Sequence, residues 1–261
     1  MWHDVEVITI KTKKDIEILR EGGKRHAQIL KALASMVRPG RSTKYLNDQA
    51  ERLIRVGGDE SSFLNFQPYG ADRPYPASLC VSINDEVVHG IPNEEEKILK
   101  EGDIVSLDLG LKHKGLYTDA AVTVPVGNIR PEVERLLSVT KKALMKGIRE
   151  IKEGATIGDI GFAIQECAQK EGYGIVRELA GHGVGYDVHE MPYVPNYGKK
   201  GKGEILKEGM VLAIEPMFNL GTDKVILDKK DGYTYRSADG SPSAHFEHTV
   251  VVTKTGVEIL T

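Results

Sequence analysis

The segment ILKEG occurs twice in this chain, at 98–102 and at 205–209, and each copy leads into an apolar run that ends on an acid. The first run reads ILKEGDIVSLD and ends on Asp108, and the second reads ILKEGMVLAIE and ends on Glu215. A carboxylate inside an apolar, strand-like run is costly to keep charged without a partner. The repeat therefore predicts a duplicated unit, folded about a pseudo-twofold axis, whose carboxylate strands meet at one centre.

Helical patterns repeat in the same order. The capping box TKKD and a periodic apolar pattern predict a first helix, and a second is expected from about 43 to 56. In the second half, Pro131 stands near the first position of a long helical pattern, and the segment TIGDIGFAIQECAQKEGYG follows as a short capped helix. Each half thus reads as helix, glycine-containing link and helix.

The matching extends to residues that carry chemistry. SINDEVVHGIP aligns with HGVGYDVHEMP and pairs His89 with His189, while YTDAAVTV aligns with HFEHTVVV and pairs Asp119 with Glu247. The last pair requires a longer connection, residues 217–244, in the second half. One such match arises easily by chance, but several in the same order do not.

The two aspartates of the first half lie in a predicted hairpin. IVSLDLG and YTDAAVTV alternate like strands, and a two-residue turn at His113–Lys114 would set Asp108 opposite Asp119. Like charges directly across a ladder are destabilising, more so where the dielectric is low. A metal ion is therefore a better candidate for the missing cation than Lys112 or Lys114, which lie in the turn.

The second half supplies further ligand types. Glu215 and Glu247 lie among apolar neighbours, and His182 lies between glycines in AGHGVG. An oxygen-rich set with an imidazole suits Mn, Fe, Co or Zn rather than a structural zinc site, which prefers thiolates. Four carboxylates are balanced by two divalent ions, and a pair of ions sharing a water is a known device for hydrolysis.

Taken in order, Asp108, Asp119 and the motifs GHGVG, EP and FEHT resemble the type I methionine aminopeptidases, over nearly the whole chain. The resemblance implies an α+β pita-bread (creatinase/aminopeptidase) fold, with two pseudo-twofold-related halves and an antiparallel sheet covered by helices on one face. We expect a single catalytic domain at 1–261, with half-repeats at about 12–128 and 129–261.

The resemblance also implies the site. The metal ligands would be Asp108, Asp119, His182, Glu215 and Glu247, with Asp119 and Glu247 bridging two ions of Co, Mn, Fe or Zn. His89 and His189 would lie near the scissile bond, and Glu215 could also carry a proton. The implied reaction removes the N-terminal methionine of peptides and nascent proteins, with a preference for a small second residue.

A pocket for the methionine side chain would contain Phe66, Tyr75 and Cys80 by resemblance, with Phe63 as an alternative aromatic. The sequence departs from the family here, because the segment QPYGADRP at 67–74 is longer than usual.

A second departure concerns the wall of the same pocket. Val188 stands where a bulky aromatic is common, and the only tryptophan is Trp2, so the usual pocket tryptophan is missing. Tyr233 or Tyr235, in the polar stretch at 223–243, could replace it, although an exposed loop is the commoner fate of such a stretch.

The other histidines are assigned structural roles. His26 and His113 fall outside the repeated pattern and are expected to be satisfied core side chains. His245 and His248 flank Glu247 and are expected at most to support the ligands.

Composition excludes other classes of function. The 35 Lys and Arg residues against 38 Asp and Glu give a net charge of −3, so nothing indicates nucleic-acid or membrane binding. There is no secretory pattern and no run of about 18 apolar residues. Cys80 and Cys167 cannot form a disulfide framework, which fits a reducing compartment. We expect a cytoplasmic monomer whose nascent-chain substrates emerge at the ribosome.

Two alternatives stay open at this point. An Xaa-Pro aminopeptidase or prolidase would use the same five ligands, but such enzymes usually carry a large extra N-terminal domain, whereas only about 80 residues precede VVHGIP here. A non-catalytic peptide-binding homologue would keep the fold and lose the metals. A separation of 32 positions between Glu215 and Glu247 leaves little room for the helical insertion of the type II enzymes.

Overall fold

The computed structural model describes residues 7–261, so Trp2 and the start of the chain lie outside the described residues. The helices are α1 (Lys13–Met36), α2 (Thr43–Val56), α3 (Pro131–Arg149) and α4 (Ile157–Glu171). The strands before α3 are β1 (Glu60–Ser61), β2 (Cys80–Ile83), β3 (Glu86–Val88), β4 (Ile104–His113) and β5 (Leu116–Pro125). The strands after α4 are β6 (Gly174–Ile175), β7 (Gly181–Gly183), β8 (Glu190–Val194), β9 (Val211–Ile214), β10 (Met217–Asn219), β11 (Val225–Leu227), β12 (Tyr235–Ser237), β13 (Ser243–His245), β14 (His248–Thr253) and β15 (Gly256–Ile259). Across residues 7–261, none of the helices has the length and apolar character needed to cross a bilayer.

The helices begin where their capping residues predict. In α1 the Asp15 amide donates to the Thr12 hydroxyl (3.2 Å) and the Thr12 amide donates to the Asp15 carboxylate (3.0 Å), which completes a capping box. Thr156 and Asp159 form the same box at the start of α4. Pro131 is the first residue of α3, where its missing N–H costs nothing. All four predicted helices are confirmed.

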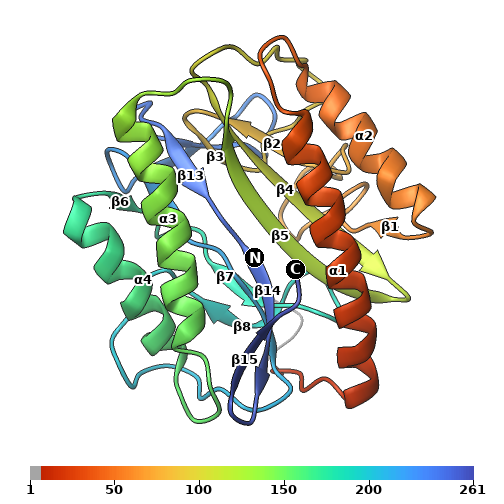
Figure 1. Cartoon of the computed structure of the whole chain (residues 1–261), viewed down its shortest axis with the longest axis vertical. Helices are drawn as coiled ribbons and strands as arrows, with labels where there is room; N and C mark the ends of the chain where they lie inside the picture. The colour runs from red at the N-terminus through yellow and green to blue at the C-terminus, as the bar shows by residue number, and fades with distance from the viewer. Residues whose placement is uncertain (1–6) are drawn as a thin grey trace.

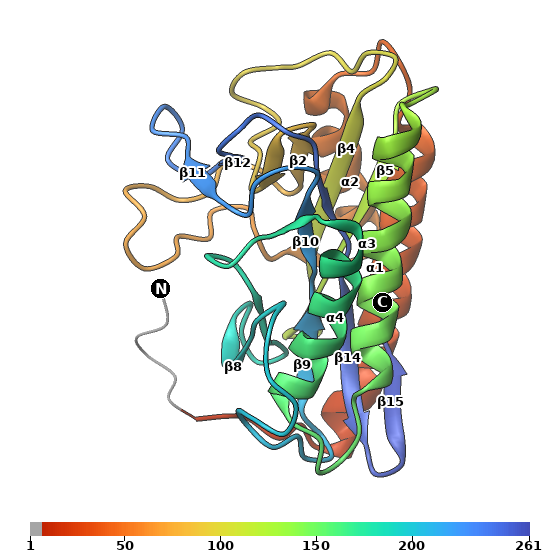
Figure 2. The ribbon, with the colours of Figure 1, turned by 90° about the vertical axis from the view of Figure 1, so that its left-hand side faces the viewer.

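The two larger sheets are antiparallel, and each belongs to one half of the chain. In the first half the order is β1–β4–β2, with β5 also paired to β4, and in the second it is β15–β14–β9–β7–β8. Figures 1 and 2 show the helices packed on one face of these sheets, while β11, β12 and the long loops lie on the other side. The expected helix-covered antiparallel arrangement is confirmed.

Each half has its own hydrophobic core between helices and sheet. In the first half, Leu107 and Leu109 of β4 are fully buried in a cluster that includes Leu33 of α1 and Leu46 of α2. Because side chains alternate along a strand, Asp108 must point to the opposite face of the sheet, away from the helices. The helices therefore stabilise the sheet from one side and leave the other side for the site.

The two copies of ILKEG make equivalent contacts. The Gly40 amide donates to the Leu99 carbonyl (2.8 Å), and the Gly154 amide donates to the Leu206 carbonyl (2.9 Å). Two isolated bridges also correspond, because Ser42 pairs with Ile98 and Thr156 pairs with Ile205. These contacts tie the start of the second helix of each half to the lead-in of its carboxylate strand. The boundaries of the half-repeats stay a prediction.

Candidate metal centre

Asp108 and Asp119 come from the β4–β5 hairpin, in a register that differs from the predicted one. Asp108 lies opposite Ala121, and Asp119 lies opposite Gly110. The predicted turn at His113–Lys114 and the direct opposition of the acids are therefore wrong. The turn residues are Lys114 and Gly115, which both have positive φ, as a tight two-residue hairpin of this kind requires.

This correction leaves both acids on one face of the sheet. It moves each pairing by two residues, and side chains alternate with a period of two, so neither carboxylate changes face. Asp108 and Asp119 are diagonal neighbours, close enough to repel through the low dielectric but with room for a cation between them.

The second half contributes Glu215, Glu247 and His182. Glu215 follows β9 directly and Glu247 precedes β14 directly, and the adjoining residues Ile214 and His248 are paired across these strands. His182, on β7, is the cross-strand partner of Ala213 on β9. Because β9 lies between β14 and β7 in the sheet, Glu215 and Glu247 both lie near the imidazole of His182.

Hydrogen bonds between β5 and β14 join the two halves at the site. The Thr249 hydroxyl accepts from the Asp119 amide (2.8 Å) and donates to the Asp119 carbonyl (2.7 Å). The Glu247 amide donates to the Ala121 carbonyl (2.9 Å). The two contacts are equivalent if Asp119 corresponds to Glu247, as the sequence alignment suggests. Asp119 is bonded to Thr249, two residues after Glu247, and Glu247 is bonded to Ala121, two residues after Asp119.

The five predicted metal ligands lie together. Asp119, His182 and Glu247 are buried and offer ligand atoms that all lie within 4.8 Å of one another. His182 Nε2 lies 3.5 Å from Glu215 Oε1. All five residues line one cavity of about 210 Å³: Asp108, Asp119, His182, Glu215 and Glu247.

The electrostatics of this cluster call for a cation. Burial, and then the charge of Glu215, raise the pKa of Asp108 to about 6, although His245 opposes the shift. Burial raises the pKa of Glu215 to about 7, and burial with neighbouring carboxylates raises those of Asp119 and Glu247 well above the usual range. Without a counter-charge these acids cannot all ionise at neutral pH.

Unpaired oxygens fit the same conclusion. Among the described residues, Asp108 Oδ1 and Asp119 Oδ1 are buried without a hydrogen-bond partner. Buried polar atoms are normally hydrogen-bonded, so each unpaired one requires an explanation such as an ion. The residues present therefore fit divalent cations held by carboxylate oxygens and an imidazole nitrogen.

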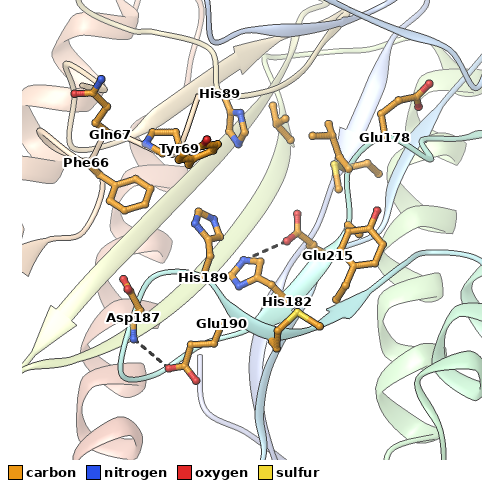
Figure 3. Close-up of a pocket in the computed structure, with 17 residues that line it drawn as sticks. Phe66, Gln67, Tyr69, His89, Glu178, His182, Asp187, His189, Glu190 and Glu215 are labelled. Carbon is orange, nitrogen blue, oxygen red and sulfur yellow. Dashed lines mark hydrogen bonds and ion pairs between the residues drawn. The ribbon is translucent and has the colours of Figure 1, made fainter. Parts of the chain in front are cut away.

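His89 and His189 stand at the edge of the metal centre. Figure 3 places the imidazoles of His89, His182 and His189 around one space, with Glu215 beside His182. The rings of His182 and His189 are 4.6 Å apart in an edge-to-face arrangement. Burial, and then His245, lower the pKa of His89 to about 4, and burial with the other imidazoles lowers that of His189 well below its usual value. Both rings are therefore neutral at pH 7 and act as hydrogen-bonding groups.

An apolar pocket adjoins the metal centre. Phe63, Phe66, Tyr75 and Cys80, which the sequence suggested, all line the same cavity as the acids, and so do Tyr233 and Tyr235. Cys80 is the cross-strand partner of Asp108. Burial, and then the charge of Asp108, raise the pKa of the Cys80 thiol, so it is a neutral, polarizable contact.

The polar stretch at 223–243 contributes a wall to this pocket. Tyr233 is buried, and its ring meets that of Tyr75 edge-on at 5.2 Å. Tyr235 pairs with Val88 across β12 and β3, which brings its ring 6.1 Å from that of His89. Both candidate tyrosines therefore reach the site. Val188 is buried but does not line the cavity.

The cavity has lining residues that the sequence did not indicate. Tyr69 of the long segment and Leu227 of β11 both lie along its wall. His245 is buried with its Nε2 3.5 Å from Glu215 Oε2 and 3.9 Å from Glu247 Oε2. His245 is expected from the sequence at most to support the ligands, and these distances agree with that role. No motif or periodic pattern in the sequence singles out Tyr69 or Leu227.

The other histidines are bonded elsewhere. His26 Nδ1 lies 3.0 Å from the Thr118 hydroxyl, and His113 Nδ1 lies 2.6 Å from Asp59 Oδ1. His248 Nδ1 lies 3.3 Å from the hydroxyl of Thr261. The geometry of His26 and His113 agrees with their assignment as buried structural side chains.

Known proteins are similar to this chain in both sequence and fold. A model of metallopeptidase family M24 matches residues 17–254. The chain belongs to metallopeptidase family M24. This M24 chain is 44% identical over 255 residues to methionine aminopeptidase 1 of Bacillus subtilis, covering 98% of this chain and 99% of that relative. It is 42% identical to a solved methionine aminopeptidase of Rickettsia prowazekii, with a TM-score of 0.92 over 98% of this chain and 100% of the other. The resemblance and the pita-bread fold inferred from the motifs are confirmed.

A more distant likeness bears on the alternative reading. The prolidase of Pyrococcus horikoshii superposes with a TM-score of 0.74 at 23% identity, over 97% of this M24 chain but 63% of that protein. This likeness shows a shared fold and nothing about the substrate.

Proposed function

We propose that the chain is a metal-dependent aminopeptidase that removes the N-terminal methionine from peptides and nascent proteins. The observation that carries the proposal is a cavity in which four carboxylates, three of them buried, and His182 adjoin two neutral histidines and an apolar pocket. Near-full-length similarity to relatives named methionine aminopeptidase supports the substrate class. The prolidase alternative has only the fold in its favour.

The roles of the residues follow from their chemistry. Asp108, Asp119, His182, Glu215 and Glu247 would hold the metal. Two divalent ions of Mn, Fe, Co or Zn, when bound, would activate a water for attack on the first peptide carbonyl.

The substrate would be handled by the neutral histidines. An N–H of His89 or His189 would donate to the carbonyl oxygen as negative charge develops on it. Glu215, at the cavity wall beside His182, would accept a proton from the attacking water.

Metal add-back tests this function. The chelated protein is assayed on Met-Ala-Ser and Ala-Pro-Ala after addition of Mn²⁺, Co²⁺, Fe²⁺ or Zn²⁺, with Asp108→Asn as the ligand variant. We expect methionine release that depends on metal and is lost in the variant. Release from the proline peptide instead would move the chain to the prolidases, and no turnover with any metal would favour a peptide-binding protein.

The second residue of the substrate should be small. Phe66, His89, His182 and His189 border both this cavity and a neighbouring one of about 220 Å³, so the second side chain would lie among these rings. The Phe66 and His189 rings are 5.7 Å apart, which leaves little space for a branched side chain. We expect kcat/KM for Met-Ala-Ser to exceed that for Met-Leu-Ser by about tenfold or more. Equal turnover of the two peptides would contradict this prediction.

We further propose a cytoplasmic location and a monomeric state. Cys80 and Cys167 are both free, buried thiols, which suits a reducing compartment. Nascent chains would then be met as they leave the ribosome. Sedimentation of the purified protein at micromolar concentration tests the monomer, and a dimer would contradict it.

A further inference from the structure

Tyr233 is held in the pocket wall by an anchor outside the pocket. Its hydroxyl donates to the backbone carbonyl of Arg73, in the long segment 67–74. Its ring is 7% exposed and packs edge-on against Tyr75 at 5.2 Å, and both rings line the cavity beside the metal centre. The position of this wall therefore depends on where Arg73 lies.

The side chain of Arg73 joins three separate parts of the chain. Its guanidinium donates through both terminal nitrogens to the carboxylate of Glu94, with Nη2 lying 2.7 Å from Oε2. Nη2 also donates to the Asp231 carbonyl at 3.0 Å. Figure 2 shows the loop before β2 and the β11–β12 hairpin on the same side of the molecule. We call the contacts among Arg73, Glu94 and Asp231 the arginine clamp.

The turn that carries Tyr233 is held together by internal hydrogen bonds, so the clamp can act on it. The Asp231 carboxylate accepts from the Tyr233 amide (2.8 Å), the Thr234 amide (2.9 Å) and the Thr234 hydroxyl (2.6 Å). The Arg73 guanidinium carbon lies 6.0 Å from the centre of the Tyr233 ring, within range of a weak cation–π contact. Arg73 therefore contacts the backbone at one end of this turn and the ring at the other.

We propose that the arginine clamp sets the depth of the pocket for the N-terminal side chain, and that Arg73 is a positioning residue for substrate selectivity. The inference rests on the proposed aminopeptidase function. A clamped Tyr233 closes the pocket behind a straight thioether side chain. A released Tyr233 gives the pocket more room, so a longer or bulkier side chain is then accepted more readily.

The geometry separates this clamp from an ordinary surface ion pair. Exposed pairs usually contribute little, because solvent screens the charges and holding two long side chains costs entropy. Here the side chains of Arg73 and Glu94 are each 39% exposed, but the contact is bidentate and a third segment is bound to the same nitrogen. Bidentate guanidinium contacts fix orientation as well as adding attraction.

Arg73→Met tests the proposal, because Met keeps the apolar stem and removes the charge and the donors. Steady-state kcat and KM are measured on Met-Ala-Ser and on the same peptide with N-terminal ethionine, which is longer by one methylene. We expect KM for Met-Ala-Ser to rise about fivefold with little change in kcat, and the preference for methionine over ethionine to fall about fivefold. Tyr233→Phe, which removes only the anchoring hydroxyl, should shift selectivity in the same direction.

Arg20→Met is the matched control. Arg20 also forms a bidentate pair, with Glu258, at similar exposure (38% and 36%), and neither residue lines the cavity. Its selectivity should equal that of the wild type. Unchanged selectivity in both Arg73→Met and Tyr233→Phe would overturn the clamp, provided that the wild type cleaves Met-Ala-Ser. A wild type that fails to cleave this peptide would instead overturn the proposed function.

Discussion

Replacing Asp119 with Asn is expected to lower kcat/KM for Met-Ala-Ser by about a thousandfold or more. Asp119, His182 and Glu247 offer ligand atoms that all lie within 4.8 Å of one another, and Asp119 is the member from the first half of the chain. An amide keeps the shape of the carboxylate but loses its charge. Both the affinity for divalent ions and the activation of a water should therefore fall. Kinetics and metal content of the purified variant provide the measurement.

The control for this substitution must distinguish the loss of metal binding from the loss of folded structure. The Asp119 contacts that join the two halves are made by its backbone to Thr249, so the variant should keep the hairpin in place. Asp48→Asn offers the same chemical change at an exposed helical site, where Asp48 pairs with Lys44 at 2.7 Å. We expect wild-type activity from Asp48→Asn. An Asp119→Asn enzyme with more than a tenth of the activity and a full metal content would rule out Asp119 as a ligand.

The duplicated lead-in predicted the placement of the site for a physical reason. Gly40 and Gly154 both adopt positive φ and both bond to the leucine of their ILKEG copy, so each copy starts its strand from an equivalent anchor. The carboxylate that lies six residues after the glycine of each ILKEG copy is therefore at the equivalent position in each half. Local sequence was enough here because the anchors are local to each half.

The hairpin register was beyond the same reasoning. Alternation placed Asp108 and Asp119 on the correct face, but it cannot tell a turn at His113–Lys114 from one at Lys114–Gly115, since these differ by two residues in register. The glycine decides, because the second central position of this tight turn needs positive φ, and Gly115 adopts it without strain. The preference for glycine at this turn position therefore predicts the observed pairing, whereas the expected opposition of Asp108 and Asp119 does not.

The pocket wall depended on contacts between distant segments. Tyr233 is placed by Arg73 and packs against Tyr75, which are remote from it in the chain. Neither strand alternation nor helical period describes such a loop, so the sequence left open whether Tyr233 would line the pocket or lie exposed. The segment 67–74 is the part that anchors it.

The metal-free protein is expected to lose stability as the pH rises from about 6.5 to 8, and bound metal should reverse this trend. A carboxyl whose pKa is higher in the folded chain than in the unfolded chain binds its proton more tightly when folded. It therefore stabilises the fold fully below its unfolded pKa, near 4, and loses that contribution as the pH rises through the folded value. For Asp108 and Glu215 the folded values are about 6 and about 7.

The change in the free energy of unfolding with pH should be large, because these carboxyl groups have strongly raised pKa values. Each such carboxyl loses on the order of 2 kcal/mol of stabilisation as the pH rises from its unfolded pKa through its folded pKa. The buried histidines oppose the trend only at acidic pH, because a lowered pKa, about 4 for His89, costs stability as the pH falls below its unfolded value near 6.5. Between pH 6.5 and 8 the carboxyls should therefore dominate.

Thermal unfolding of chelated and Mn²⁺-loaded protein across this range provides the measurement. Metal binds the ionised carboxylates, so the rise in Tm on adding Mn²⁺ should be greater at pH 8 than at pH 5.5, where protons compete for the same oxygens. The double variant Asp119→Asn/Glu247→Gln removes two of the shifted carboxyls. When chelated it should unfold at a higher temperature than chelated wild type at pH 8, and this advantage should shrink towards pH 4. A chelated wild type that is as stable as the variant at pH 8 would mean that uncompensated carboxylate charge does not destabilise the metal-free protein. The electrostatic argument for the metal centre would then fail.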